Sequence, residues 1–102
     1  MIGRMLTGAL FEGVNSSISI ERPAPRVVLM TITGKDVGEH GDEPFRELAQ
    51  DLARGPFEFF IDARRTRGAS IDVSNVWAQW LRRHRDDMHR VHMLTGTRYV
   101  QL

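Results

Sequence analysis

The sequence predicts a single α/β domain built on a mixed β-sheet, with elements in the order β-β-α-β-α-β and both helices on one face. Three observations predict this fold. Residues 27–33, 57–63 and 90–95 are short, mostly apolar runs of the kind that form buried strands. Apolar side chains recur at helical spacing in the two stretches between these runs. The length of 102 residues, with 41% hydrophobic and 26% charged residues, suits one globular domain.

A further strand is expected at residues 17–21, where polar and apolar side chains alternate as in a half-buried strand. The prolines within residues 22–25 end it, because proline cannot donate a hydrogen bond to a neighbouring strand. This strand and residues 27–33 are therefore predicted to form an antiparallel pair joined at the prolines. Residues 1–15 carry weaker signals and are expected to form a short edge strand or an arm.

Two amphipathic helices are expected. The first follows Asp42, a residue type that caps helices, and stops at Gly55. The second spans residues 73–88, with Trp77 and Trp80 on its apolar stripe and most of its charges outside. These tryptophans are expected to pack in the core, and they become interface anchors or pocket walls if the sheet leaves them partly uncovered.

Strands that are separated by helices normally pair in parallel through right-handed crossovers. The sheet is therefore expected to contain at least three parallel strands. Because two helices cover only one of its faces, residues 1–15, a continuation of the chain beyond Leu102 or a second subunit must cover the other. We therefore expect either a homo-oligomer or a chain that continues past Leu102.

Charge and composition narrow the classes of function. The formal net charge is +1, so no overall field attracts nucleic acid or a membrane surface. The chain has no cysteine, which excludes disulfides, thiolate chemistry and cysteine-ligated zinc. The first residues make a poor signal peptide, and no apolar stretch approaches the roughly 20 residues that cross a bilayer. A cytoplasmic location without membrane insertion is expected.

Polar loops are expected after each of the three parallel strands, at residues 34–38, 64–70 and 95–98. In open α/β sheets such loops gather at the carboxyl edge, where binding sites form. We interpret this edge as an anion-tolerant or phosphorylatable surface that docks an acidic partner; the alternative is an ordinary set of solvated loops. The candidate partner- or anion-binding residues are Lys35, Asp62, Arg64, Arg65, Arg67 and Arg98, and the candidate regulatory serines at the start of the second helix are Ser70 and Ser74.

Catalysis, metal binding and cofactor binding are not expected. Asp62 closes the second parallel strand without a second carboxylate or a magnesium pattern beside it, and pairing with an arginine is the simpler role. His84 and His89 lie on different sides of a helix, and no zinc-binding motif includes them. Arg82 and Arg83 are expected to pair with acidic residues one helical turn on, which favours a solvated helix face over contact with nucleic acid.

Together these segments resemble the STAS superfamily, which includes anti-sigma-factor antagonists and the related domains of sulfate transporters. The resemblance rests on the run Val27-Val-Leu-Met-Thr-Ile-Thr-Gly34, a helix, the run Phe57-Glu-Phe-Phe-Ile-Asp-Ala-Arg-Arg65, and an amphipathic helix followed by a strand. The resemblance covers residues 16–100 and lies mostly in the pattern of these segments. The family's usual Asp-Ser-Ser/Thr-Gly motif is absent, and the corresponding stretch here is residues 69–75.

The resemblance implies a regulatory protein-binding module that is not an enzyme. In the family a partner kinase phosphorylates a serine at the start of a helix, and a partner protein is then captured or released. Ser70 or Ser74 would take that role here, and a kinase-like regulator would be the protein partner. Two alternatives remain open. One is a small-molecule or lipid-binding domain with a pocket at residues 57–60 and 77–80, and the other is a structural subunit that dimerises.

Overall fold

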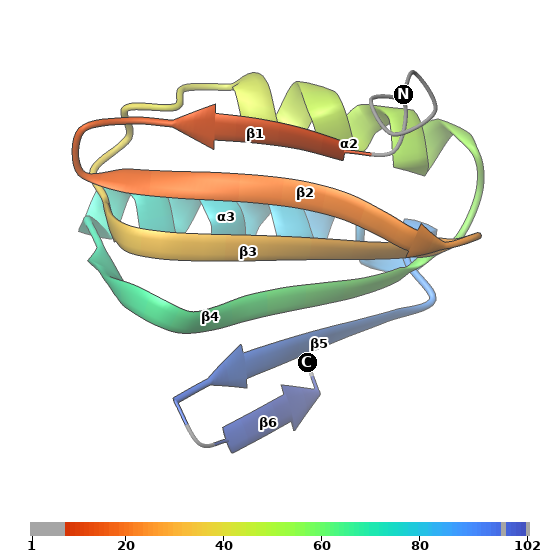
Figure 1. Cartoon of the computed structure of the whole chain (residues 1–102). Coiled ribbons are helices and arrows are strands. Elements are labelled where there is room, and N and C mark those ends of the chain that lie inside the picture. The colour runs from red at the N-terminus through yellow and green to blue at the C-terminus, as the bar shows by residue number, and fades with distance from the viewer. Residues whose placement is uncertain (1–7, 97, 102) are drawn as a thin grey trace.

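The computed structural model describes residues 8–96 in full and the backbone of residues 98–101. These residues form a six-stranded sheet, whose strands lie side by side in the order of the sequence, and two α-helices (Figure 1). The elements are β1 (Gly8–Glu12), β2 (Ser16–Ala24), β3 (Val27–Asp36), α2 (Glu43–Ala53), β4 (Glu58–Ala69), α3 (Ile71–Arg83), a 3-10 turn (Arg85–Asp87), β5 (Arg90–Thr95) and β6 (Arg98–Gln101).

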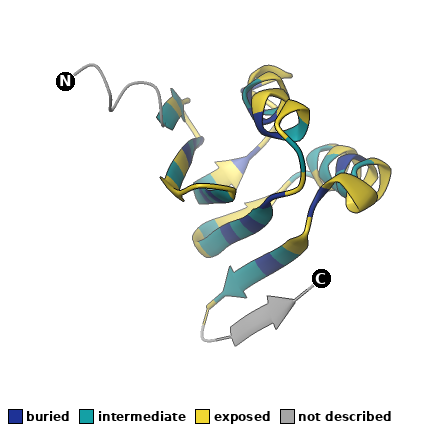
Figure 2. Ribbon diagram, turned by 90° about the vertical axis from the view of Figure 1, so that its right-hand side faces the viewer, coloured by how far each residue is buried: buried dark blue, intermediate teal, exposed yellow. Residues whose placement is uncertain are grey.

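The strand directions confirm the predicted mixed sheet. The neighbours β3, β4 and β5 are parallel, whereas β1 with β2, β2 with β3, and β5 with β6 are antiparallel. Both parallel connections carry their helix over the same side of the sheet, so α2 and α3 lie on one face, as predicted (Figures 1 and 2). Within the described part of the chain no element covers the opposite face. The second subunit that would cover it stays a prediction.

Strands at both edges extend the sheet beyond the predicted order. Residues 8–12 form β1, which pairs with β2 and confirms an edge strand at this end of the chain. Residues 1–7, which the same prediction included, lie outside the described residues. Residues 98–101 form β6 beside β5, a strand that was not predicted.

The arginine-rich segment after Asp62 belongs to a strand, and the predicted loop at residues 64–70 was wrong. β4 continues to Ala69 because β3 runs beside it as far as Asp36, and their pairing persists through two irregularities in register. Hydrogen bonds between strands join backbone groups, so they place no demand on the side chains. A polar segment can therefore extend a strand when its neighbour is long enough.

The second helix, α3, ends at Arg83, and the predicted end at residue 88 was wrong. A 3-10 turn, Arg85–Asp87, follows it. This turn contains two aspartates whose negative charge would oppose the dipole at the carboxyl end of a longer helix. The predicted ion pairs one helical turn apart are absent from the described residues, and Oδ2 of Asp87 instead lies 3.4 Å from Nδ1 of His84.

The hydrophobic core lies between the sheet and the two helices. Along β4, alternate side chains point toward the helices, as the two-residue period of a strand requires. Phe59 is fully buried, and its ring lies edge-on to Trp80 of α3 with centroids 6.1 Å apart. Phe60 points to the opposite face, where it is half-buried and stacks on His92. The buried apolar residues are Ile18, Ile20, Val28, Met30, Leu48, Phe57, Phe59, Ile61, Trp80 and Met88.

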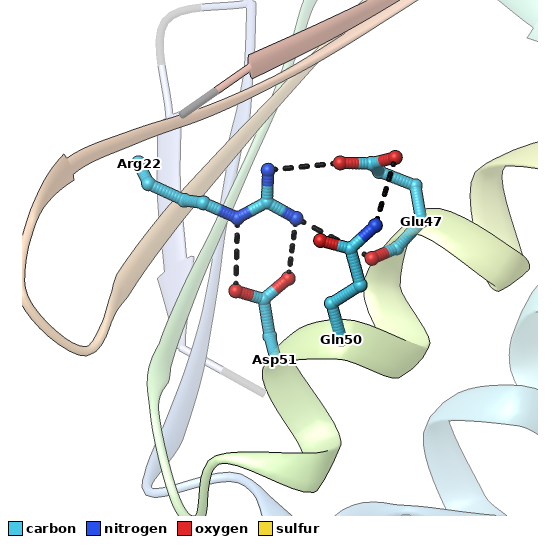
Figure 3. A network of polar contacts seen from close by, with 4 residues as sticks. All are labelled: Arg22, Glu47, Gln50 and Asp51. Atoms are coloured by element: carbon cyan, nitrogen blue, oxygen red, sulfur yellow. Dashed lines mark hydrogen bonds and ion pairs between the residues drawn. The ribbon is translucent and has the colours of Figure 1, made fainter. Parts of the chain in front are cut away.

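A buried ion network fastens β2 to α2 (Figure 3). Arg22 donates from Nε and Nη2 to the two carboxylate oxygens of Asp51, at 2.9 and 2.7 Å, and from Nη1 to Oε2 of Glu47 at 2.9 Å. The side chains of Arg22 and Asp51 are only 9% and 6% exposed. The hydrogen bond to Asp51 raises the pKa of Arg22 above its ordinary value. Because the charges are buried as a matched set, removing one leaves the other without compensation.

Candidate functional site

The predicted site lies at the carboxyl edge of the parallel strands. The ends of β3 and β4, the amino ends of α2 and α3 and the turn between β1 and β2 meet there (Figure 1). Backbone hydrogen bonds tie these segments together. The N–H of Lys35 donates to the carbonyl oxygen of Asn15 at 2.9 Å, and the N–H of Ser70 donates to that of Asp36 at 2.9 Å. The edge is therefore a connected surface and not a set of separate loops.

Two polar contacts hold the loop before α2 against β2. Oγ of Ser16 and Nε2 of His40 lie 2.9 Å apart, and both residues are buried. A carboxylate oxygen of Glu39 accepts the backbone N–H of Asn15 at 3.0 Å. This hydrogen bond lowers the pKa of Glu39 below its ordinary value. Each pair is 24 residues apart and belongs to no motif, so the sequence carries no signal for either contact.

The two candidate regulatory serines differ in what their hydroxyl groups do. Oγ of Ser70 accepts the backbone N–H of Val73 at 3.2 Å, so Ser70 caps the amino end of α3. Ser74 is exposed in the first turn of α3, and its hydroxyl makes no hydrogen bond with the described residues. The hydroxyl of Ser74 is therefore not part of the helix cap.

A hollow of about 390 Å³ opens between the amino ends of α2 and α3. We call it the edge hollow. A smaller hollow of about 210 Å³ lies next to it between the same helices, and Asp42, Phe45 and Val76 lie in the walls of both. We refer to the two neighbouring hollows together as the groove. The residues of the edge hollow that matter below are Val37, Phe45, Val76 and Trp77, which are apolar, and Asp42 and Asp72, which carry carboxylates.

Exposed large apolar side chains gather at the carboxyl edge. Val14, Ile71, Val76 and Val37 are 98%, 78%, 48% and 45% exposed, and all four lie at this edge. Leu10, on β1, is the remaining one within the described residues. Single apolar side chains are normal on a protein surface, but a cluster of them is typical of an interaction site.

A second hollow, of about 360 Å³, lies between α3 and the sheet. We call it the sheet hollow. Trp77 forms part of the wall of both hollows. Trp80, in contrast, is buried in the core, as are Phe57 and Phe59 from the predicted pocket at residues 57–60. The other apolar residues of the sheet hollow include Met30, Ile32, Ile61, Leu81 and Met93.

The edge hollow is not lined by any of the candidate anion-binding lysines and arginines whose side chains the structure describes. Arg64 pairs with Asp62, to whose carboxylate its Nε and Nη2 donate at 2.9 and 2.8 Å. The hydrogen bond from Arg64 lowers the pKa of Asp62 below its ordinary value. Lys35, Arg65 and Arg67 are exposed on β3 and β4, and the side chain of Arg98 lies outside the described residues.

Searches for two other kinds of site found nothing in residues 8–96. No group of three or more histidines and carboxylates in this range is arranged to hold a metal ion. Neither of the two α-helices that the structure describes is long and apolar enough to cross a membrane.

The mixed sheet with two helices on one face is a SpoIIAA-like fold, which confirms the resemblance to the STAS superfamily at the level of the fold. The comparison structure is the crystal structure of an uncharacterized protein from the DUF3478 family, from Shewanella loihica PV-4, described as having a SpoIIAA-like fold. The two structures align with a TM-score of 0.66 and 19% sequence identity, over 88% of this chain and 75% of that chain. No family model matches the sequence, and no curated protein matches it.

Proposed function

We propose that this chain is a regulatory protein-binding module that docks a protein partner at its carboxyl edge and acts without catalysis. The observation that carries the proposal is the edge hollow, in whose wall the exposed apolar side chains of Val37 and Val76 lie. The SpoIIAA-like fold supports a regulatory role, because the STAS superfamily that the sequence resembles includes anti-sigma-factor antagonists. Docking at this edge needs only an accessible surface, which the arrangement of α2 and α3 supplies.

Phosphorylation at the start of α3 is the proposed switch. Ser74 suits it better than Ser70, because the hydroxyl of Ser70 is engaged as a helix cap. A phosphoryl group adds about −1.5 to −2 charges at neutral pH. Ser74 itself lines the sheet hollow, and a phosphoryl group on it would lie one helical turn from Trp77 and two residues from Asp72, which are both in the wall of the edge hollow. A docked partner would therefore meet an altered charge and shape.

We expect Ser74→Asp to change the affinity for the protein partner by at least about fivefold, the lower end of ordinary coupling between two sites. The partner is first identified by photo-crosslinking in extracts of the source organism, from a benzophenone side chain placed at position 76. Its affinity for purified wild type and variant is then measured by calorimetry. Ala49→Asp, on the exposed side of α2, adds the same charge elsewhere and should leave the affinity unchanged.

Two results would contradict this proposal separately. If position 76 yields no more crosslinked protein than the exposed control position 21 on β2, docking at the carboxyl edge is wrong. If the partner binds wild type, Ser74→Asp and Ser70→Asp equally well, and all three are folded by circular dichroism, docking stands and the phosphorylation switch is wrong.

A second candidate function is the binding of a small apolar ligand, and the sheet hollow favours it. Its walls are mostly apolar, and its volume of about 360 Å³ falls in the range of ordinary ligand sites. Met30 and Met93 lie in its wall and supply methyl groups that report on occupancy.

Lauric acid is a suitable probe for this second function. We expect its titration to shift the methyl resonances of Met30 and Met93, and we expect Ala78→Trp, which fills the hollow, to weaken binding by about tenfold or more. Ala53→Trp on the exposed side of α2 is the matched control. Unchanged methyl resonances at saturating lauric acid would rule this function out for fatty acids.

A further inference from the structure

We propose that the edge hollow binds a basic, aliphatic segment of the partner protein. Such a segment carries leucine-like or valine-like side chains with lysine or arginine beside them. The inference rests on the docking function proposed above and specifies the chemistry of the partner. Two features of the hollow carry it: an apolar wall that is partly exposed, and carboxylates at the rim that have no partner among the described residues.

The apolar wall is aromatic and open to solvent. The ring centroids of Phe45 and Trp77 lie 4.3 Å apart, and those of Trp77 and Trp80 lie 5.8 Å apart. Trp80 is buried, so this aromatic cluster continues into the core. Val76 and Val37 extend it outward, each with nearly half of its surface exposed. Covering this surface with aliphatic side chains would remove apolar area from water, which is the main source of binding free energy at interfaces.

The rim of the edge hollow is acidic. Asp42 lies at the amino end of α2 and Asp72 in the first turn of α3, and both are exposed. No hydrogen bond or ion pair between described residues uses either carboxylate, and Asp42 does not cap α2 with its side chain. Glu43 adds a further negative charge beside Asp42. Among the residues whose side chains the structure describes, no lysine or arginine lines this hollow. A positively charged segment is therefore the complementary occupant.

The groove also favours one direction for the bound segment. The smaller hollow lies next to the edge hollow between α2 and α3, and both Asp42 and Arg83 lie in its wall. A segment lying along the groove would meet carboxylates at the carboxyl edge and a guanidinium at the other end. Its basic residues therefore belong at the end nearest Asp42 and Asp72.

This chemistry differs from the acidic partner that the sequence predicted. Of the cationic residues behind that prediction, Arg64 is already paired with Asp62. Lys35, Arg65 and Arg67 lie on the strands and do not line the edge hollow, although Lys35 directly precedes Asp36 in its wall. An acidic segment entering the hollow would place its charge beside Asp42 and Asp72, which costs binding free energy. We therefore favour the basic segment and treat the acidic one as the competing outcome.

Three synthetic peptides without tryptophan test the proposal. One is an amphipathic Leu/Lys helix, the second its Leu/Glu counterpart, and the third a Ser/Lys peptide that keeps the charge and lacks the apolar face. We expect the Leu/Lys peptide to shift the backbone amide resonances of Val37, Gly38 and Val76, and to bind more tightly than the other two. The double variant Asp42→Asn/Asp72→Asn should weaken it roughly three- to tenfold, and added salt should reduce the difference.

The control double variant Glu21→Gln/Asp86→Asn removes the same charge from exposed positions outside the hollow and should leave the affinity unchanged. Tighter binding of the Leu/Glu peptide at the same amides would overturn the basic partner and leave the docking function intact. If the Ser/Lys peptide binds as tightly as the Leu/Lys peptide, the apolar wall does not contribute to binding. If none of the peptides shifts these amides, the inference fails; docking itself is decided by the crosslinking at position 76.

Discussion

Replacing Arg22 with methionine is expected to lower the free energy of unfolding by about 3–5 kcal/mol, the usual cost of removing one partner from a buried ion pair. The substitution leaves the carboxylate of Asp51 almost fully buried and without the two hydrogen bonds that Arg22 donates to it. It also removes the contact with Glu47, which joins the same network on α2. Urea denaturation followed by circular dichroism measures the change.

Two further variants make this result specific. Arg46→Met changes an exposed arginine on α2 and should alter the free energy of unfolding by less than about 0.5 kcal/mol. The double variant Arg22→Met/Asp51→Leu removes both buried charges and should recover much of the loss. If Arg22→Met costs no more than Arg46→Met, the network is not fastening β2 to α2.

Phe59→Ala is expected to lower the free energy of unfolding by about 3–5 kcal/mol, because it leaves a cavity at the centre of the core. The ring of Phe59 is fully buried and contacts Phe57 and Trp80 edge-on. Phe60→Ala, one residue further along β4, should cost clearly less, since Phe60 is half-buried on the face that the helices leave uncovered. The comparison is again made by urea denaturation.

This pair of neighbouring residues also tests the oligomeric state. If Phe60→Ala and Phe59→Ala lower the free energy of unfolding equally, the face opposite the helices is covered in solution. Analytical ultracentrifugation at the same concentrations would then identify a second copy of the chain as the cover. If Phe60→Ala lowers the free energy of unfolding clearly less than Phe59→Ala, and the protein is a monomer in the ultracentrifuge, the predicted homo-oligomer is contradicted.

The central part of the fold could be predicted because its side chains reveal its geometry. The buried run at residues 27–33 and the alternating run at residues 17–21 have the signatures of a central and a half-buried strand, and both are strands. The hairpin between them is present, but the predicted end of the first strand at the prolines was wrong, because β2 continues through Pro23 to Ala24 with an irregularity in register after Glu21. Alternation of strands with helices then predicts parallel pairing, which β3, β4 and β5 confirm.

The parts of the fold that could not be predicted depend on backbone pairing and not on side-chain pattern. Residues 64–69 are polar and were expected to be a loop, yet they are held in β4 by hydrogen bonds to β3. The edge strand β6 is short and needs its neighbour β5 in order to form. The end of α3 depends on a local electrostatic conflict that a pattern of apolar residues does not register.

The candidate site could be located but not described from the sequence. The carboxyl edge follows from the parallel topology, and the start of α3 follows from Ser70 as a cap. The edge hollow, however, joins Val37 and Asp42 from one loop to Val76 and Trp77 from a helix. Only the packing of α2 beside α3 creates that combination. The assignment of an anion site to Arg65 and Arg67 stays a prediction.

The position of Trp77 links the two hollows. Its side chain lies in the wall of both hollows and contacts Phe45 and Trp80, so a ligand that displaces the indole in one hollow also changes the shape of the other. If a ligand in the edge hollow and a ligand in the sheet hollow each displace the indole, the two ligands would compete without direct contact. Thermodynamic reciprocity makes such antagonism equal in both directions. An apolar small molecule bound in the sheet hollow would then weaken the binding of a protein at the edge hollow, and the bound protein would weaken the binding of the small molecule.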